Sequence, residues 1–207
     1  QFTLKKWAIY AGFDPQGQSF YTPNARVQRV IDALKTDTNR VDALALAQDI
    51  QVNRPDYVVF IPRQPRDKTK RDPARPGDTY NDHFQVIEHT GKLFAFWTQA
   101  SREADIDQHI AFSISRDHGE TWSDPIILAG SHSKKIPGLL ASWQQPMFSK
   151  SGRIYLLWNH QTTSRGPHCG QMFGFYSDDE GATWSSPKMV PMQRMSQIGR
   201  ASCRERV

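Results

Sequence analysis

An eight-residue motif occurs twice in the chain, and this repeat constrains the fold more than any other feature of the sequence. Residues 115–122 and 177–184 share Ser, Asp, Gly, Thr and Trp at the same five positions, 62 residues apart. A Ser and a Pro follow each copy. Upstream, residues 91–97 match residues 152–158 at an offset of 61. Such self-similarity predicts that one supersecondary unit is built twice.

Each unit is expected to form four antiparallel strands. In the first unit, runs of β-branched and aromatic residues are separated by the Thr90-Gly91 turn, a loop over 100–107 and a turn over 117–119. The second unit repeats this order. Four-stranded units at such a period are typical of β-propeller blades, which bury their faces against neighbouring blades. The predicted strands are 83–89, 92–98, 108–115 and 121–128, then 144–149, 153–159, 170–177 and 184–190.

The residue types of the motif predict a structural role. A short Asp accepts hydrogen bonds from the backbone of its own turn, Gly permits a positive φ, and Trp buries a large face against a neighbouring strand. We therefore expect both copies to be folding devices. Their residues are Ser115, Asp117, Gly119 and Trp122 in the first copy, and Ser177, Asp179, Gly181 and Trp184 in the second.

Residues 1–79 are less regular and are expected to form a separate N-terminal segment. Thr22-Pro23, followed by apolar residues at helical spacing, predicts an amphipathic helix capped by Thr22. A shorter helix is expected near 41–49. Residues 56–61 predict a buried strand that ends at Pro62. Residues 63–78 are expected to be a solvated loop.

The last ten residues, 198–207, match the translation of a widely used sequencing adaptor, so we expect them not to belong to the natural protein. The natural chain is then expected to continue past Gln197. Without these residues the formal net charge falls from +5 to +3, because three arginines and one glutamate are removed. Cys169 is then the one cysteine left, and no internal disulfide is expected.

Several classes of function find no support in the sequence. The small net charge gives no argument for nucleic acid, and no run of apolar residues is long enough to span a bilayer. Residues 1–20 lack the pattern of a signal peptide. No Cys/His metal spacing, phosphate-binding glycine loop or dinucleotide motif occurs, so neither a metal nor a cofactor is predicted.

The two copies, each ending a four-stranded unit, resemble the Asp-box repeats of the sialidase (neuraminidase) superfamily over residues 80–190. The resemblance implies an all-β, six-bladed β-propeller, of which residues 80–197 would supply two blades and the whole chain about half of the ring. It also implies a glycan partner and a secreted or periplasmic location. A chain truncated in this way is expected to be inactive.

Strand parity predicts where chemistry could occur. If the first strand of each unit begins at the upper end, the loop over 100–107 also lies there and both Asp boxes lie at the opposite end. Sialidases begin a blade with an Arg-Ile-Pro segment that Gln144-Gln145-Pro146 resembles. Sliding back by 61 residues puts His83 at the arginine place of the first unit.

The resemblance also supplies a catalytic candidate. Residues 93–96 match the Leu-Leu-Ala-Phe segment of sialidases, after which a second arginine falls on Ala100 and the aspartate general acid/base falls on Asp105. Arg102 could replace the missing arginine. Asp107 is the alternative acid if the loop is aligned two residues differently.

Three functions remain open at this point. The first is a sialidase-superfamily glycoside hydrolase that removes a terminal sugar, with Asp105 as general acid. The second is a polysaccharide lyase in which His83 or His109 abstracts a proton, while Arg102 or Arg165 neutralises a uronate carboxylate. The third is a non-catalytic carbohydrate-binding propeller in which Trp143, Trp158 or Trp97 stacks on sugar rings.

Overall fold

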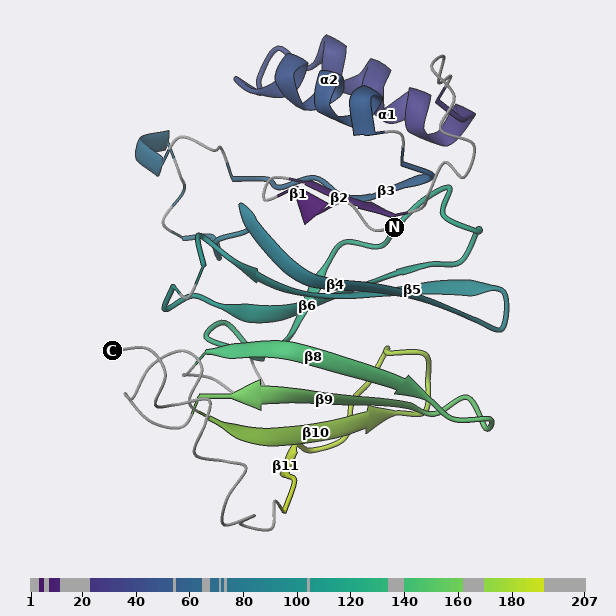
Figure 1. Ribbon diagram of the computed structural model, residues 1–207, viewed down its shortest axis with the longest axis vertical. Helices are drawn as coiled ribbons and strands as arrows, with labels where there is room; N and C mark the ends of the chain where they lie inside the picture. The colour runs from purple at the N-terminus through teal and green to yellow at the C-terminus, as the bar shows by residue number, and fades with distance from the viewer. Residues whose placement is uncertain are drawn as a thin grey trace.

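The computed structural model is a stack of three antiparallel sheets with a pair of helices on one outer face (Figure 1). It describes residues 4–5, 8–11, 23–53, 55–64, 68–70, 72, 74–103, 105–133, 140–161 and 170–191. The described chain is therefore mostly β, with helices confined to its N-terminal part, as the sequence predicts.

The first sheet and the helices form the N-terminal layers. Strands β1 (Leu4–Lys5), β2 (Ala8–Ala11) and β3 (Tyr57–Phe60) pair in that order, and helices α1 (Ala25–Thr36) and α2 (Ala43–Asn53) lie in the connection from β2 to β3. The cap of α1 is Asn24, not Thr22, because the Asn24 side chain accepts a hydrogen bond from the Val27 amide at 3.0 Å. The helices bury one apolar cluster against β3: Val27, Ile31, Leu34, Ala43, Leu46, Ala47 and Ile50, with Val30, Val58 and Ile61 partly buried.

The two predicted four-stranded units are confirmed as two sheets whose strands follow one another in chain order. The fourth strand of each is shorter and begins later than predicted. Residues 123–125 and 185–187 leave the ladder first, and each segment ends in a proline, which cannot donate to a ladder. The strands are β4 (Tyr80–His89), β5 (Lys92–Ala100), β6 (His109–Ser115) and β7 (Ile126–Gly130), then β8 (Ala141–Phe148), β9 (Ile154–His160), β10 (Gln171–Ser177) and β11 (Lys188–Met189).

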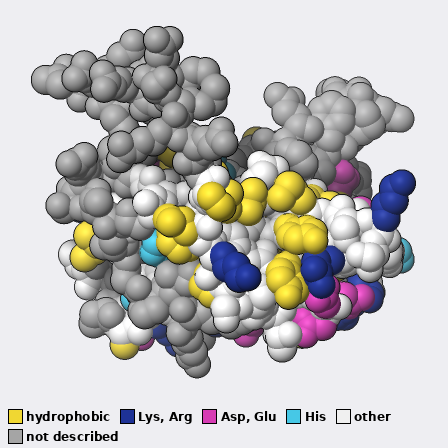
Figure 2. Space-filling view, turned by 90° about the horizontal axis from the view of Figure 1, so that it is seen from below, with side chains coloured by type: hydrophobic (Ala, Val, Ile, Leu, Met, Phe, Trp, Pro, Cys, Tyr) yellow, Lys and Arg dark blue, Asp and Glu magenta, His cyan; other side chains and the backbone are white. Residues whose placement is uncertain are grey.

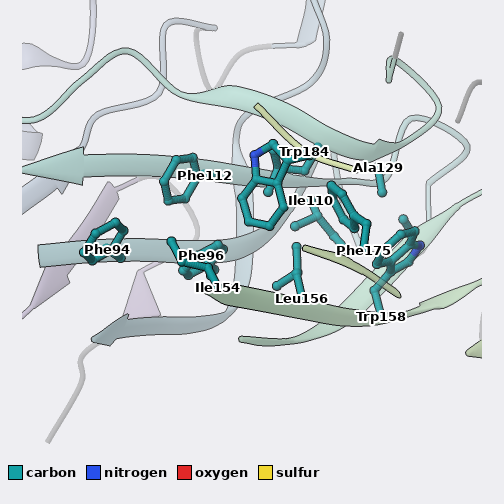
Figure 3. Packing of buried hydrophobic residues seen from close by; sticks show 12 residues of the cluster. Phe94, Phe96, Ile110, Phe112, Ala129, Ile154, Leu156, Trp158, Phe175 and Trp184 are labelled. Carbon is teal, nitrogen blue, oxygen red and sulfur yellow. The ribbon is translucent and has the colours of Figure 1, made fainter. Parts of the chain in front are cut away.

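The main hydrophobic core lies between these two sheets (Figure 3). Aromatic rings dominate it: the Phe96 and Phe112 centroids are 4.8 Å apart, and those of Phe175 and Trp184 are 4.6 Å apart. Its twelve buried residues are Phe94, Phe96, Ile110, Phe112, Leu128, Ala129, Ala141, Ile154, Leu156, Trp158, Phe175 and Trp184. A second cluster, which includes Phe60 and Trp97, joins the first sheet to the second in the same way.

Both Asp boxes adopt the same hydrogen-bonded turn. Asp117 Oδ1 accepts from the Ser115 hydroxyl at 2.8 Å and from the Thr121 amide at 2.9 Å, and the Thr121 hydroxyl donates to Oδ2 at 2.6 Å. Asp179 accepts the matching bonds from Ser177 and Thr183. In both copies the carboxylate, of Asp117 or Asp179, is thus bonded within its own turn.

The box glycines touch the sheet before their own. Gly119 and Gly181 have φ values of +87° and +86°, which glycine adopts without steric cost. A Cβ built on Gly119 would lie 2.0 Å from the Tyr57 ring, and one on Gly181 would lie 2.6 Å from the Phe112 ring. Each box therefore locks its sheet onto the preceding one.

The threonine of each box should control the acidity of its aspartate. Hydrogen bonds from Thr183 hold the pKa of Asp179 at about 2, well below its ordinary value of 3.8. Replacing Thr183 with Val removes the hydroxyl donor, so we expect the pKa of Asp179 to rise towards 3.8 while that of Asp117 stays at about 2. An NMR titration of the two carboxyl carbons measures both values, and equal shifts at both sites would refute this account.

Among the described residues, neither helix is long and apolar enough to cross a membrane.

Candidate functional site

The two ends of the stacked sheets differ in what they carry. Register pairs Leu93 with Ser115, so the hairpin turn at residues 90–91 and the Asp box lie at one end. Tyr80 pairs with Ala100 at the other end, where the loop over residues 101–108 and the start of β4 meet. We call this second end, with residues 80–83, 99–109 and 140–144, the upper end. The boxes lie opposite the upper end, as strand parity predicts.

A β-bulge interrupts the first strand of each four-stranded sheet at the upper end. The register shifts between Asp82 and Gln85 in β4, and between Ser142 and Gln145 in β8. The two bulges match at an offset of 60 residues, not 61. His83 is therefore equivalent to Trp143, and Phe84 to Gln144, which corrects the alignment expected from sequence.

The bulges force two bulky residues into left-handed backbone conformations. His83 has a φ of 52° and Trp143 a φ of 56°. The other non-glycine residues with positive φ in the described chain are Thr90, His118 and Glu180, and all three lie in turns. A left-handed residue inside a strand stores strain, and such strain is concentrated at functional sites.

His83 and Trp143 are exposed side by side. Their ring centroids are 6.1 Å apart with an interplanar angle of 77°, and Trp143 is 41% exposed. His83 Nδ1 lies 3.3 Å from Asp82 Oδ2, which also accepts a hydrogen bond from the Tyr80 hydroxyl at 2.8 Å. His83 is thus on the surface where sequence predicts it, held by a carboxylate that the sequence analysis did not assign to it.

Tyr80 is the member of this group that sequence reasoning missed. Burial raises the pKa of Tyr80 above its ordinary range, and so do the hydrogen bond to Asp82 and the nearby charges of Asp82 and Glu103. The phenol therefore stays protonated and donates to Asp82. The spacing Tyr80-x-Asp82, which puts both side chains on one face of a strand, was the available signal.

Gln144 was predicted to face the upper surface, but its side chain is buried. Its side chain is 2% exposed, its amide nitrogen donates to the backbone carbonyls of His83 and Phe96, and its amide oxygen accepts from the Thr98 hydroxyl at 2.9 Å. These bonds join β8 to the preceding sheet, so the amide is fully used in packing. Gln145, its neighbour, is exposed on β8.

Asp107 anchors the upper loop. Its carboxylate accepts hydrogen bonds from the Ser101 hydroxyl at 2.6 Å, from the Ser101 amide at 3.1 Å and from the Gly77 amide at 3.1 Å. A carboxylate with this many donors is a structural anchor. The structure therefore gives no support to Asp107 as the alternative acid.

Asp105 lies in the same loop and has fewer hydrogen-bond donors than Asp107. Its side chain is 20% exposed, and Oδ2 accepts from Arg102 Nε at 2.7 Å. Arg102 is 68% exposed. The anchor at Asp107 thus fixes a loop that presents an aspartate and an arginine together at the upper end.

His109 is buried, contrary to the prediction that it contacts substrate. Its side chain has no exposed surface, Nδ1 lies 2.7 Å from the Asp107 carbonyl oxygen, and Nε2 lies 3.2 Å from the side-chain amide of Gln99. Burial lowers the pKa of His109 to about 4. Both ring nitrogens face carbonyl oxygens, which can only accept, so the neutral imidazole, with its single N–H, donates to only one of them. Since His109 has no exposed surface, it cannot contact a substrate as the base of a lyase.

The buried His109 predicts a specific acid sensitivity. The folded pKa of about 4 lies below the ordinary 6.5, so the unfolded chain binds a proton that the folded chain rejects. The free energy of unfolding should therefore fall as the pH drops from 6.5 to 4, by on the order of 3 kcal/mol. The His109→Gln variant should lose this part of the pH dependence, while His118→Gln, at an exposed turn, should keep it. Urea unfolding at several pH values measures the effect; identical pH profiles for wild type and His109→Gln would contradict it.

The remaining candidates divide clearly. Arg165 lies outside the described residues. Trp97 and Trp158 are fully buried in the core and are not available to stack on a sugar, whereas Trp143 is. Among the residues that the structure describes, no group of three or more His, Cys, Asp and Glu side chains is placed to hold a metal ion.

Comparison with known proteins gives one family match and several similar folds. The family model described as a BNR repeat-like domain matches residues 91–203, slightly more than half of the chain. A search of curated proteins found no match.

Three solved structures illustrate the similarity. The Hadza microbial sialidase is 20% identical, with a TM-score of 0.44 over 55% of this chain and 26% of that one. The α-L-arabinofuranosidase from Fusarium graminearum is 10% identical, with a TM-score of 0.40 over 56% and 33%. A thermostable family-43 glycoside hydrolase is 16% identical, with a TM-score of 0.39 over 66% and 43%.

The matched part spans between a quarter and a half of the length of each of these proteins. The family match rests on the repeated units, since residues 91–203 contain both Asp boxes and most of both four-stranded sheets. The chain belongs to the BNR repeat-like domain family.

Proposed function

We propose that the protein is a glycoside hydrolase of the sialidase superfamily, which removes a terminal sugar from a glycan at the upper end of its sheets. Asp105 is the proton donor to the leaving oxygen. Arg102 orients Asp105 through the ion pair between its guanidinium and the Asp105 carboxylate. The observation that carries the proposal is the anchored loop that presents Asp105 at the same end of the sheets as the exposed pair of His83 and Trp143.

The proposed architecture is a six-bladed propeller in which the described four-stranded sheets are consecutive blades. Support comes from the stacking of each sheet on the one before it through an Asp box. The outer face of the last sheet carries a groove of about 480 Å³ lined by Tyr155, Leu157, Tyr176, Met189 and Val190, among others. Figure 2 shows hydrophobic side chains gathered on this face, which suits a further blade.

A lyase is less well supported than a hydrolase, because one of its two proposed histidines is buried and neutral. The alternative of a carbohydrate-binding protein without turnover is still supported by Trp143, whose exposed ring could stack on a sugar. A nucleophile and any further arginines would have to come from other parts of a whole propeller.

The test is a turnover assay with the protein expressed from its complete reading frame. Methylumbelliferyl glycosides of sialic acid, galactose, glucose and arabinofuranose are incubated with the protein, and a uronate-containing polysaccharide is assayed in parallel for unsaturated products. Release of methylumbelliferone supports the hydrolase. Unsaturated uronate without glycoside cleavage would establish a lyase, and binding without either product would establish a binding protein.

A further inference from the structure

We propose that the upper end holds the terminal ring of a neutral sugar, stacked on Trp143 and hydrogen-bonded by His83, and that it discriminates against sugars carrying a carboxylate. This subsite rests on the proposed function in taking its ligand to be a glycan. It goes further by naming the class of sugar and the residues that select it.

The aromatic pair supplies the shape of the subsite. β4 and β8 are the edge strands of their sheets, and the bulges turn His83 and Trp143 out of the ladders there. The near-perpendicular rings, 6.1 Å apart, form a corner with an indole on one side and an imidazole on the other. The C–H groups of a sugar ring pack on the apolar indole face, while its hydroxyls meet the polar edge of the imidazole.

The backbone conformations of His83 and Trp143 cost the folded protein free energy. The same left-handed conformation occurs at equivalent positions of two successive repeats, although a strand does not require it. Each such residue costs about 1–3 kcal/mol, and glycine would remove most of this cost. Keeping His and Trp at these positions is explained if their exposed rings bind a ligand.

The charges around the corner favour a neutral ligand. The described upper end carries four carboxylates, those of Asp82, Glu103, Asp105 and Asp107. The one guanidinium that the described part of this end contributes, Arg102, is paired with Asp105, and the His83 ring lies beside Asp82. A sugar carboxylate placed here would meet like charges, which is unfavourable at short range. Sugar hydroxyls, in contrast, can donate to Asp82.

No arginine occupies the two positions at which the sialidase pattern would bind a sugar carboxylate. Phe84, which the bulge aligns with Gln144, is buried against Trp97, and Ala100 is fully buried. These are the places at which the sialidase pattern has arginines. In this chain they are uncharged and face the core, so they offer no planar cation to a sialic acid or a uronate.

Matched pairs of methyl glycosides test the selectivity. Methyl β-D-galactopyranoside and methyl β-D-glucopyranoside are compared with the corresponding methyl uronates by saturation-transfer NMR on the complete protein at pH 7. We expect at least one neutral glycoside to bind and its uronate partner to bind at least about tenfold more weakly, a difference of about 1.4 kcal/mol. Equal or tighter binding of both uronates, or no binding of any of the four, overturns the subsite.

Three variants locate the binding. Trp143→Gly should abolish binding of the neutral glycoside without lowering the melting temperature, because glycine relieves the strained φ. Asp82→Asn removes one negative charge. It should therefore reduce, several-fold, the ratio of the affinity for the neutral glycoside to the affinity for its uronate. Leu44→Ala, at an exposed apolar residue on α2, should leave binding unchanged. Neutral-sugar binding that survives Trp143→Gly, or an unchanged ratio in Asp82→Asn, contradicts the proposal.

The subsite and the proposed hydrolase can fail separately. Neutral glycosides that bind but are never cleaved would support the subsite and count against the hydrolase. Efficient cleavage of a sialoside would support the hydrolase and overturn the subsite.

Discussion

Replacing Trp184 with Ala should lower the free energy of unfolding by about 3–5 kcal/mol, the range found for large-to-small changes at buried aromatic residues. Trp184 is 8% exposed and packs against Phe112 of the preceding sheet and Phe175 of its own. Its indole also donates to the Gly181 carbonyl at 3.1 Å. The variant loses the contact that holds one four-stranded sheet onto the other, and urea unfolding followed by circular dichroism measures the loss.

Trp122 provides the matched control for this prediction, because it occupies the same position of the first Asp box. It is only partly buried, and it packs at the edge of the smaller cluster that contains Phe60 and Trp97. We therefore expect Trp122→Ala to cost clearly less than Trp184→Ala. Equal losses in the two variants would show that the interface between the four-stranded sheets is not the main source of stability.

Replacing Asp105 with Asn should reduce kcat by roughly 10²–10⁴-fold on any glycoside that the protein cleaves, the usual contribution of a general acid/base. Asn has nearly the same shape and still accepts a hydrogen bond from Arg102, but it cannot transfer a proton. KM should change little, because the proposed sugar contacts belong to His83 and Trp143. Steady-state kinetics with the best methylumbelliferyl glycoside from the turnover assay measures both constants.

Two controls separate chemistry from folding in this experiment. Asp124→Asn changes a carboxylate that is 84% exposed and lies near the opposite end, so it should leave kcat unchanged. Asp107→Asn should weaken the anchor of the upper loop and therefore lower stability as well as activity. If Asp105→Asn retains full kcat, Asp105 is not the proton donor.

The repeated units could be predicted because their signals are local. The Asp box, the glycine turns and the apolar strands between them determine turns and strands over a few residues each, and the structure confirms two four-stranded sheets. The strands β1 and β2 were not predicted because each is short, and because two helices separate β2 from its partner β3 in the sequence. Pairing over such a distance leaves no local pattern.

The candidate site was predicted less completely, and the bulges explain why. A bulky residue such as Trp143 rarely adopts a left-handed backbone, so nothing in the sequence around it signals a register shift. Because the sequence alignment was one residue out of register, it placed Gln144 at the surface, where the structure has Trp143. His109 was misplaced for a different reason: its burial depends on the fold of the upper loop and on the polar contacts of Gln99 and Asp107.

The central claim is that a sugar binds at the upper end, and the indole signals of the six tryptophans test it most directly. The ¹H–¹⁵N spectrum of the protein is recorded during titration with methyl β-D-galactopyranoside and methyl β-D-glucopyranoside, with the Trp143 signal assigned from the Trp143→Phe variant. The account predicts that a bound glycoside shifts the Trp143 signal and leaves those of buried Trp97 and Trp158 nearly unchanged. Shifts at Trp122 and Trp184, at the Asp-box end, with Trp143 unaffected would contradict it.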